Sequence, residues 1–415
     1  MNDQSRAIPP SASLEVDTNL LGKYADRLAK SLDKEMRRVF HPNDRKTLRK
    51  FTAGELTEYT GINASTARAR HKDGSFPEVE TDGRGHRLYT AEEMDAIRQI
   101  MIHTGKNGEE YRAGRRDGDP MQIISVVNFK GGSGKTTTTA HIANYLTLRG
   151  FRTLVVDMDP QASLSTFFGY RPELDFDSPE ELTIYDALCY EDADQGIRRA
   201  SLREVIRKTY FHNLDIAPAS LELAEYETTT AYALNTNATR KTSHTIFAAR
   251  LAEKLAEVQD DYDIVLIDCP PQLGFTTLTA ITASTGLLVT VVPGMLDIAS
   301  MSQFLKLATD TMEAIRGKSS KVHSWSFVKF LITRFEPSDG PQNQMASYLR
   351  HLLGSQVLIN PMLKSTAFSD AGMAHQTLYE VDPKQLVKST LDRAIGSMNA
   401  VGREIEGIIH QVWGR

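Results

Sequence analysis

An apolar β-rich stretch, a glycine-rich loop and a helical segment follow one another in residues 122–150. This order constrains the fold more than any other feature of the chain. The stretch reads QIISVVNF, the loop reads KGGSGKT, and the helix stops at Gly150. A strand that leads through glycines into a helix brings backbone N–H groups and the positive end of the helix dipole to one point. The sequence therefore predicts a phosphate-binding loop in an α/β sheet.

The loop departs from the general pattern G-x-x-x-x-G-K-[ST] in two ways. Phe129 stands where the first glycine is expected, and a second lysine, Lys130, precedes the glycines. Lys135 is expected to neutralise the terminal phosphates of a nucleotide, and the Thr136 hydroxyl to ligate Mg²⁺. A glycine-rich turn with incidental lysines is the alternative, but it does not explain the flanking strand and helix. The predicted nucleotide-binding residues are Lys130, Gly131, Gly132, Ser133, Gly134, Lys135, Thr136 and Thr137.

Apolar runs alternate with helical segments from residue 121 onwards. The runs are QIISVVNF, RTLVVDMD, LDIAP, YDIVLIDCP, GLLVTVVP and FVKFLITR. They are continuous rather than alternating in hydropathy, as is typical of strands buried on both faces of a parallel sheet. We therefore expect residues 121–415 to form an α/β domain of the P-loop NTPase type, with a mainly parallel sheet covered by helices on both faces.

Aspartates end two of these runs. Asp157 and Asp159 follow LVV, and Asp268 follows IVLI. The carboxyl ends of parallel strands meet at one edge of a sheet, where the phosphate loop is also expected. Each aspartate alone could be a turn former. Three of them beside a phosphate loop indicate the carboxylates of a magnesium–phosphate site.

The N-terminal region has a different texture. Residues 1–18 are polar with a Pro-Pro pair and are expected to be disordered. Residues 19–48 predict one amphipathic helix that ends before Pro42, and its apolar stripe packs either on its own chain or on a second subunit. The stripe consists of Leu21, Tyr24, Leu28, Leu32 and Met36.

Residues 49–104 predict a winged helix-turn-helix. Thr52 with Glu55 and Thr90 with Glu93 are capping boxes that begin two helices. A second short helix follows the first after a tight turn, and a glycine-containing hairpin precedes the last helix, which is the order of elements in this motif. Residues 105–120 are polar, charged and glycine-rich, and we expect them to be a linker.

Basic residues gather on the second helix and the hairpin of this predicted domain. Recognition helices use such side chains for phosphates and guanine edges, and wings add backbone contacts. The alternative is a solvated basic face on a small helical domain. The predicted DNA-binding residues are Arg68, Arg70, Lys72, Arg84 and Arg87.

The composition excludes several classes of protein. The chain has only two cysteines, which rules out a disulfide scaffold or a Cys-rich metal site and fits a reducing cytoplasm. No run approaches the roughly 18 apolar residues of a membrane span. The first residues contain no apolar segment of the kind found in secretory signals.

Three motifs together, KGGSGKT, DMDPQ and VLIDCPP, resemble those of the deviant Walker A ATPases of the ParA/MinD group. Over nearly the whole chain from about residue 20, the sequence is similar to ParA-type plasmid partition ATPases with an N-terminal DNA-binding domain. The resemblance is strongest to the RepA group of the repABC plasmid systems. It is carried by NFKGGSGKTTTTAHIANYL, DMDPQASLS, DYDIVLIDCPPQLGF and TRFEPSDGPQNQM. It implies ATP and Mg²⁺ as cofactors and ATP hydrolysis as the activity.

The resemblance also implies roles for single residues. Lys130 corresponds to the signature lysine, which in a sandwich homodimer reaches the ATP bound by the other subunit. Thr136 and Asp268 would ligate Mg²⁺, with Asp157 near the metal, and Asp159 would position the attacking water. The expected catalytic residues are therefore Lys130, Lys135 and Asp159. Loops at Thr333-Arg334 and Pro361 are where relatives contact the adenine.

The implied function is segregation of low-copy plasmids and repression of the protein's own operon. The predicted domain at 49–104 would recognise the operator, the ATP-bound dimer would bind bulk DNA through C-terminal lysines and arginines, and a ParB-like centromere-binding partner would stimulate hydrolysis. The protein would be cytoplasmic and nucleoid-associated. A MinD-like membrane helix is disfavoured by Glu404 and Glu406 in GREIEGIIHQVWGR. The alternative is an ATP-liganded transcriptional repressor with little turnover.

Overall fold

The computed structural model describes residues 18–39, 46–175, 181–191, 198–236, 246–316 and 324–415. The chain divides into two units, residues 1–46 and 47–415. The first unit contains helix α1 (Thr18–Val39), which corresponds to the amphipathic helix that the sequence predicts. Leu21, Tyr24 and Leu28 of its stripe are exposed. The remaining stripe side chains, Pro42 and residues 1–17 lie outside the described residues. Of the tail expected to be disordered, 1–18, only Thr18 is described, and it is the first residue of α1.

The second unit begins with three helices and a pair of very short strands. Both predicted capping boxes are present, with Thr52 bonded to Glu55 and Thr90 bonded to Glu93. The strands pair antiparallel, with Phe51 opposite Tyr89, and a bridge between Thr81 and Arg87 closes a turn before the second strand. The elements are β1 (Phe51–Thr52), α2 (Ala53–Thr60), α3 (Ala64–Lys72), β2 (Leu88–Tyr89), α4 (Ala91–Thr104) and the 3₁₀ turn η1 (Gly108–Tyr111).

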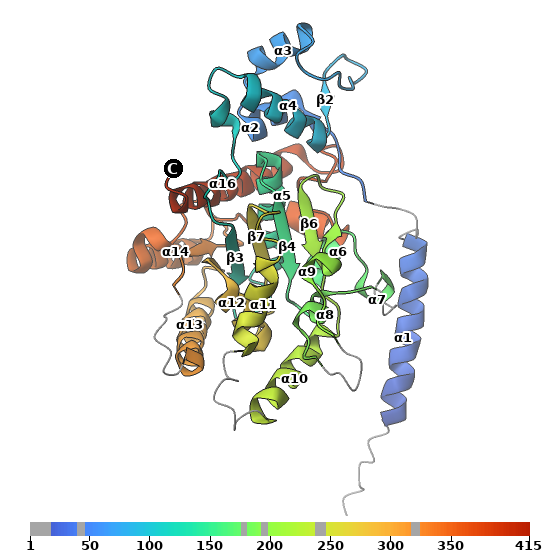
Figure 1. Cartoon of the computed structure of the whole chain (residues 1–415), viewed down its shortest axis with the longest axis vertical. Helices are drawn as coiled ribbons and strands as arrows, with labels where there is room; N and C mark the ends of the chain where they lie inside the picture. The colour runs from blue at the N-terminus through green and yellow to red at the C-terminus, as the bar shows by residue number, and fades with distance from the viewer. Residues whose placement is uncertain (1–17, 40–45, 176–180, 192–197, 237–245, 317–323) are drawn as a thin grey trace, which may run out of the picture. The chain divides into compact units, whose positions relative to one another are not determined.

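The main sheet has seven strands within the described residues, in the order β5-β6-β4-β7-β3-β8-β9. All neighbouring strands are parallel except β5 and β6, which confirms the predicted α/β class with a mainly parallel sheet. Figure 1 shows β3, β7, β4 and β6 side by side. The strands are β3 (Gln122–Val127), β4 (Thr153–Asp157), β5 (Arg207–Lys208), β6 (Leu214–Ala217), β7 (Ile264–Asp268), β8 (Gly286–Val291) and β9 (Phe327–Ile332).

Helices cover both faces of this sheet. Successive side chains of a strand point to opposite faces, and in β7 Leu266 belongs to one apolar core while Val265 and Ile267 belong to another. The helices and the short 3₁₀ turn are α5 (Lys135–Arg149), α6 (Ser163–Phe167), α7 (Pro172–Asp175), α8 (Ile184–Leu188), α9 (Leu202–Val205), α10 (Leu223–Thr236), α11 (Ile246–Ala256), α12 (Phe275–Ala283), α13 (Met295–Arg316), α14 (Gly340–Leu353), η3 (Gly354–Gln356), α15 (Thr366–Met373) and α16 (Lys388–Val412).

Residues 51–104 pack against α5 and α16 of the α/β region. Arg98 of α4 is only 2% exposed and donates hydrogen bonds to Tyr59 O at the end of α2 and to Leu148 O at the end of α5. Arg149 of α5 also donates to Tyr59 O, at 2.8 Å, and pairs with Glu406 of α16 at 2.9 Å. Buried charged groups of this kind need partners to offset the loss of hydration. The contact between the two regions is therefore specific.

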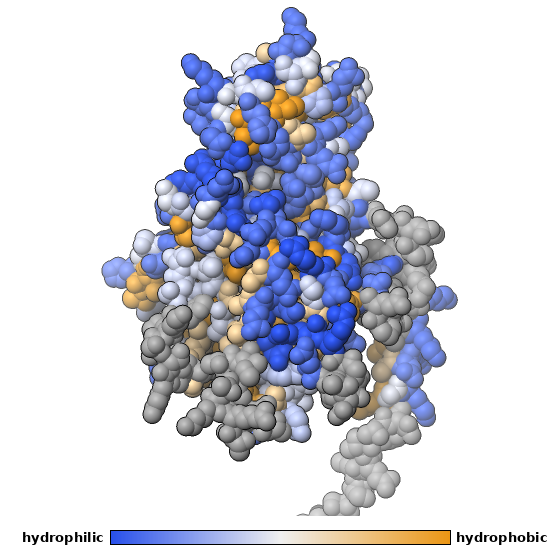
Figure 2. All heavy atoms as spheres, in the orientation of Figure 1, coloured by the Kyte–Doolittle hydropathy of each residue, from blue (hydrophilic) through white to orange (hydrophobic). Residues whose placement is uncertain are grey.

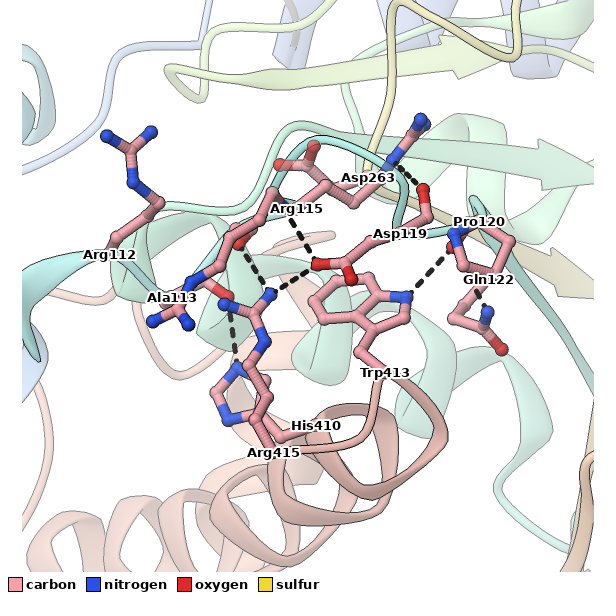
Figure 3. Close-up of polar contacts among 12 residues, drawn as sticks. Arg112, Ala113, Arg115, Asp119, Pro120, Gln122, Asp263, His410, Trp413 and Arg415 are labelled. Atoms are coloured by element: carbon pink, nitrogen blue, oxygen red, sulfur yellow. Dashed lines mark hydrogen bonds and ion pairs between the residues drawn. The ribbon is translucent and has the colours of Figure 1, made fainter. Parts of the chain in front are cut away.

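The predicted linker is fastened to the end of α16 (Figure 3). Trp413 donates its indole N–H to Pro120 O at 2.9 Å, and His410 lies 3.0 Å from Ala113 O. Arg415 donates to Gly114 O at 3.0 Å and to Asp119 Oδ2 at 2.8 Å. These contacts fix the connection, so residues 47–415 form one compact unit.

The face of the molecule shown in Figure 2 is mostly hydrophilic, with apolar side chains at the surface near α14. Tyr348 and Leu352 are 49% and 57% exposed there. Within the part of the chain that the structure describes, no helix combines the length and the apolar character needed to cross a bilayer.

Candidate functional site

The glycine-rich loop joins β3 to α5 as the sequence predicts. Gly132 and Gly134 adopt φ angles of 74° and 84°, which residues with a side chain rarely reach. Gly134 is the N-cap of α5 and has no side chain to cap the helix, so the first N–H groups of α5 remain for a ligand. This is the geometry of an anion-binding site at a helix N-terminus.

A layer of polar side chains holds the loop from behind. Asn128 accepts a hydrogen bond from Lys130 N at 3.0 Å and donates to Thr290 O of β8. The hydroxyls of Ser133 and Thr290 are 3.0 Å apart. Asn128 is 3% exposed and Thr290 is fully buried, so the layer belongs to the core and presents a fixed loop to the surface.

Lys135 lies inside the loop at the start of α5. It is 7% exposed, and its Nζ is 3.4 Å from the Lys130 carbonyl oxygen. Burial lowers its pKa, and the carboxylate of Asp268 partly opposes this effect. A buried lysine among backbone N–H groups is matched to the phosphates of a nucleotide.

Asp157 and Asp268 stand opposite each other at the ends of β4 and β7. Both oxygens of Asp157 are occupied, because Oδ1 accepts from Asp159 N at 3.1 Å and Oδ2 accepts from the N–H and hydroxyl of Ser165, each at 2.8 Å. Asp157 therefore holds the loop that carries Asp159. Asp159 itself is only partly buried and accepts from Gln161 N at 2.9 Å through Oδ1.

Asp268 is a buried carboxylate with one oxygen that has no partner among the described residues. It is 1% exposed, and its Oδ1 accepts a weak hydrogen bond from Thr139 at 3.4 Å, whereas Oδ2 has no hydrogen-bond partner within the described residues. Burial and the neighbouring Asp157 raise its pKa, and the hydroxyl of Thr136 lowers it. An orphaned buried carboxylate oxygen beside a threonine hydroxyl fits Mg²⁺, which prefers oxygen ligands and needs few from the protein.

Lys130 points away from its own loop. Its Nζ lies 2.8 Å from Asp297 Oδ1, in the first turn of α13, and its side chain is 48% exposed. The two lysines of the motif are thus separated, with Lys135 buried at the loop and Lys130 at the surface. Phe129, which replaces the expected glycine, is 46% exposed.

The two residues for which we expect adenine contacts, Thr333 and Arg334, lie against the phosphate loop. Thr333 is fully buried and donates its hydroxyl to Ser133 O at 2.7 Å. Arg334 donates to Gly132 O at 3.2 Å. The Thr333 hydroxyl is therefore already engaged by the protein.

The predicted DNA-binding cations lie on α3 and on the turn before β2. Arg68, Lys72 and Arg84 are exposed, and Arg70 and Arg87 are half-buried. Among residues that the structure describes, none of these five cations has a carboxylate within ion-pair distance. Their charges are available to an external anion.

Sequence reasoning missed three residues around the loop. Thr290 is a polar residue inside an apolar strand, and Asn128 directly follows one. A polar residue at such a position breaks the apolar pattern and could have indicated a role at the site. Asp297 carries no such signal, because an acidic residue in the first turn of a helix is ordinary.

Known proteins are similar to this chain over its whole length. Residues 121–320 match the family described as AAA domain. The chain is 45% identical to putative replication protein A of Sinorhizobium fredii, over 100% of this chain and 99% of that protein. It is 27% identical to protein SopA of Escherichia coli, over 82% of each.

A solved structure described as a partition protein has a TM-score of 0.63 to this chain at 20% identity. The match covers 94% of this chain and 99% of that one. At this identity the similarity establishes the fold, and it extends through the segment ahead of the α/β region.

Proposed function

Because the chain belongs to the ParA-type partition ATPases, in the group of replication protein A, we propose that it is a Mg²⁺-dependent ATPase that segregates plasmids and represses its own operon. The observation that carries the proposal is the arrangement of Lys135, Thr136 and Asp268. A buried lysine, a hydroxyl and an orphaned carboxylate oxygen converge at a helix N-terminus. A nucleoside triphosphate with Mg²⁺ matches this site, because its phosphates are negatively charged and the metal prefers oxygen ligands.

The nucleotide phosphates would lie on the backbone N–H groups of residues 131–137. Lys135 would donate to the terminal phosphates, and Thr136 and Asp268 would hold the metal, which neutralises charge as the phosphate transfers. Asp157 lies next to Asp268, so it would be close to the metal, and it holds the neighbouring loop through Asp159 N and Ser165 N.

Asp159 is proposed to orient the water that attacks the terminal phosphate. Its Oδ1 accepts a hydrogen bond from Gln161 N, and Oδ2 accepts none from the residues that the structure describes. A carboxylate with one fixed and one free oxygen can accept a proton or a hydrogen bond from water. The hydrolysis then proceeds by positioning and charge stabilisation, as in other P-loop enzymes.

A sandwich homodimer completes the site in this proposal. Lys130 is exposed at the surface and does not contact its own phosphate region, so it is placed to serve a nucleotide held by a second subunit. ATP would therefore favour the dimer, and hydrolysis would release it. Exposed apolar side chains at the start of α13, Met295 and Leu296, lie close in sequence to Asp297 and support a protein contact there.

We propose that residues 49–104 are a winged helix-turn-helix that recognises the operator. The cations of α3 and the turn support this role, because they have no carboxylate partner among the described residues and phosphate contacts supply most of the affinity for DNA. Bulk DNA would be bound by the ATP-bound dimer, in the cytoplasm and on the nucleoid. A ParB-like centromere-binding protein is the proposed partner that stimulates hydrolysis, and this rests on the family alone.

The test is ATP hydrolysis measured in four conditions: protein alone, with non-specific DNA, with the centromere-binding partner, and with both. If the protein is a partition ATPase, its basal rate of ATP hydrolysis should be low. DNA and partner together should stimulate it by more than the product of their separate effects. A basal rate that neither ligand changes, with operator binding still sensitive to ATP, would instead identify an ATP-liganded repressor.

A further inference from the structure

Two consecutive residues after β9 contact two consecutive carbonyls of the phosphate loop. The Thr333 hydroxyl donates to Ser133 O at 2.7 Å, and the Arg334 guanidinium donates to Gly132 O at 3.2 Å. The bonded residues are 200 and 202 positions apart in the sequence, so the tertiary fold and not local structure brings them together.

The geometry of the peptide bond gives these contacts a consequence. In a trans peptide the C=O and the following N–H point in opposite directions. Fixing the Gly132 carbonyl therefore fixes the direction of the Ser133 N–H, and fixing the Ser133 carbonyl fixes the Gly134 N–H. Because the carbonyls are held on the side of β9, the two N–H groups point away from it.

The loop needs an external support of this kind. Gly132 and Gly134 have positive φ, and glycine loses more conformational freedom on ordering than any other residue. The side chain of Ser133 is held by Thr290, but the Asn128, Ser133 and Thr290 contacts do not reach the carbonyls of Gly132 and Ser133. Only Thr333 and Arg334, among the described residues, hold these two peptide units from outside.

The backbone conformation of Arg334 supports a functional role for this residue. Its φ is 52°, one of four positive values at non-glycine residues in the described chain. Such a conformation costs free energy and persists where the surroundings impose it. The neighbouring hydrogen bonds, from Thr333 N to Val291 O at 2.8 Å and from Phe335 N to Met362 O at 3.0 Å, hold the backbone on both sides of the strained residue.

We propose that Thr333 and Arg334 are positioning residues that preorganise the Ser133 and Gly134 N–H groups for the phosphates of the nucleotide. The proposal deepens the proposed function and rests on its nucleotide site. Thr333 acts through the Ser133 carbonyl and Arg334 through the Gly132 carbonyl, and neither needs to contact the adenine. Their effect is therefore confined to ligands that carry phosphates.

The test compares the affinities of ATP, ADP and adenosine by calorimetry or fluorescence competition. Thr333→Val removes the hydroxyl at nearly constant volume, and we expect it to weaken ATP and ADP by about tenfold, since one buried carbonyl loses its donor. Adenosine, which has no phosphate, should bind as it does to the parent protein. Thr333→Ser keeps the donor and should restore the ATP affinity.

Arg334→Asn provides a second variant that does not depend on the buried position. Asparagine tolerates positive φ, so the substitution removes the guanidinium with little change of backbone. It should weaken ATP and leave adenosine unchanged, and it keeps the test decisive where Thr333→Val fails to fold.

Equal losses for ATP and adenosine would overturn the proposal, because they would place these residues at the base. Unchanged ATP affinity in both Thr333→Val and Arg334→Asn would overturn it as well. If the parent protein binds no ATP, the proposed function fails at that step, and the two failures are thereby distinguished.

Discussion

Lys130 and Asp297 form an ion pair within one chain, with Nζ 2.8 Å from Oδ1. The pair joins the phosphate loop to the first turn of α13. In the proposed sandwich dimer Lys130 must leave Asp297 to reach the other subunit's nucleotide. The pair therefore competes with dimer formation.

Asp297→Asn is expected to raise ATP-dependent dimerisation. Lys130 is 48% exposed, and pairs of this exposure are worth about 0.2–1 kcal/mol each. A homodimer breaks two such pairs, one in each subunit, so the dimer dissociation constant should fall by up to about thirtyfold. Sedimentation in the presence of a non-hydrolysable ATP analogue measures the change. Asp310→Asn, on the exposed side of the same helix, is the matched control. An unchanged dissociation constant in Asp297→Asn would show that the pair imposes no barrier.

Replacing each of the two lysines of the loop should have a different effect on ATP binding and hydrolysis. Lys135→Ala removes the buried charge of the phosphate site and is expected to abolish ATP binding. Lys130→Ala should keep ATP binding in the monomer but lose partner-stimulated hydrolysis, because the side chain lies outside its own site. Equilibrium binding and turnover assays on both variants give the result. Wild-type stimulation in Lys130→Ala would contradict the sandwich assignment.

Asp159→Asn is expected to bind ATP normally and to hydrolyse it at least about 100-fold more slowly. The amide retains an oxygen for the Gln161 N–H and removes only the charge. Asp157→Asn should behave differently, because one of its two oxygens becomes a donor that faces existing N–H or O–H donors. Thermal unfolding should therefore show a loss of stability in Asp157→Asn and little in Asp159→Asn. Full turnover in Asp159→Asn would move the water-positioning role to another residue.

Arg98→Met is expected to lower the free energy of unfolding by about 2–4 kcal/mol. The guanidinium joins the ends of α2 and α5 and pairs with Asp95, so its loss removes the donor of the buried Leu148 carbonyl and one of the donors to Tyr59 O and to Asp95. Urea denaturation measures the change. Arg68→Met is the matched control, because Arg68 is exposed and should alter stability by less than about 0.5 kcal/mol. Equal stability of the two variants would show that the contact between α4 and α5 contributes nothing.

The sequence predicts much of this molecule because several of its signals are local. The capping boxes at Thr52 and Thr90 depend on residues three positions apart, and both form as predicted. Continuous apolar runs likewise indicate buried parallel strands without reference to the rest of the chain. The phosphate loop belongs to the same class of signal, since strand, glycines and helix are adjacent in the sequence.

Contacts between distant segments were beyond such reasoning. The Lys130–Asp297 pair and the hydrogen bond from Thr333 to Ser133 join residues that only the folded sheet brings together. The packing of residues 51–104 on α5 could not be predicted either, because the sequence pattern around Arg98 is that of an ordinary surface arginine on an amphipathic helix. Its burial depends on carbonyl groups of α2 and α5 that the sequence does not specify.

His141 makes the fold sensitive to acid. Its ring is 1% exposed in α5 and lies 2.7 Å from Thr137 O through Nδ1, while Nε2 accepts from Leu378 N at 3.1 Å. An acceptor at Nε2 and a donor at Nδ1 require the neutral ring. Burial lowers the pKa of His141 from 6.5 to about 4.

Because the folded pKa lies below the unfolded value, this histidine stabilises the fold above pH 6.5, and the contribution is lost as the pH falls towards about 4. The loss amounts to about 3 kcal/mol over this window. His141→Gln keeps an acceptor for the Leu378 N–H and cannot be protonated, so its free energy of unfolding should fall less steeply between pH 6.5 and 4 than that of the parent protein. Urea denaturation at several pH values measures both slopes. Identical slopes would mean that other groups determine the acid sensitivity.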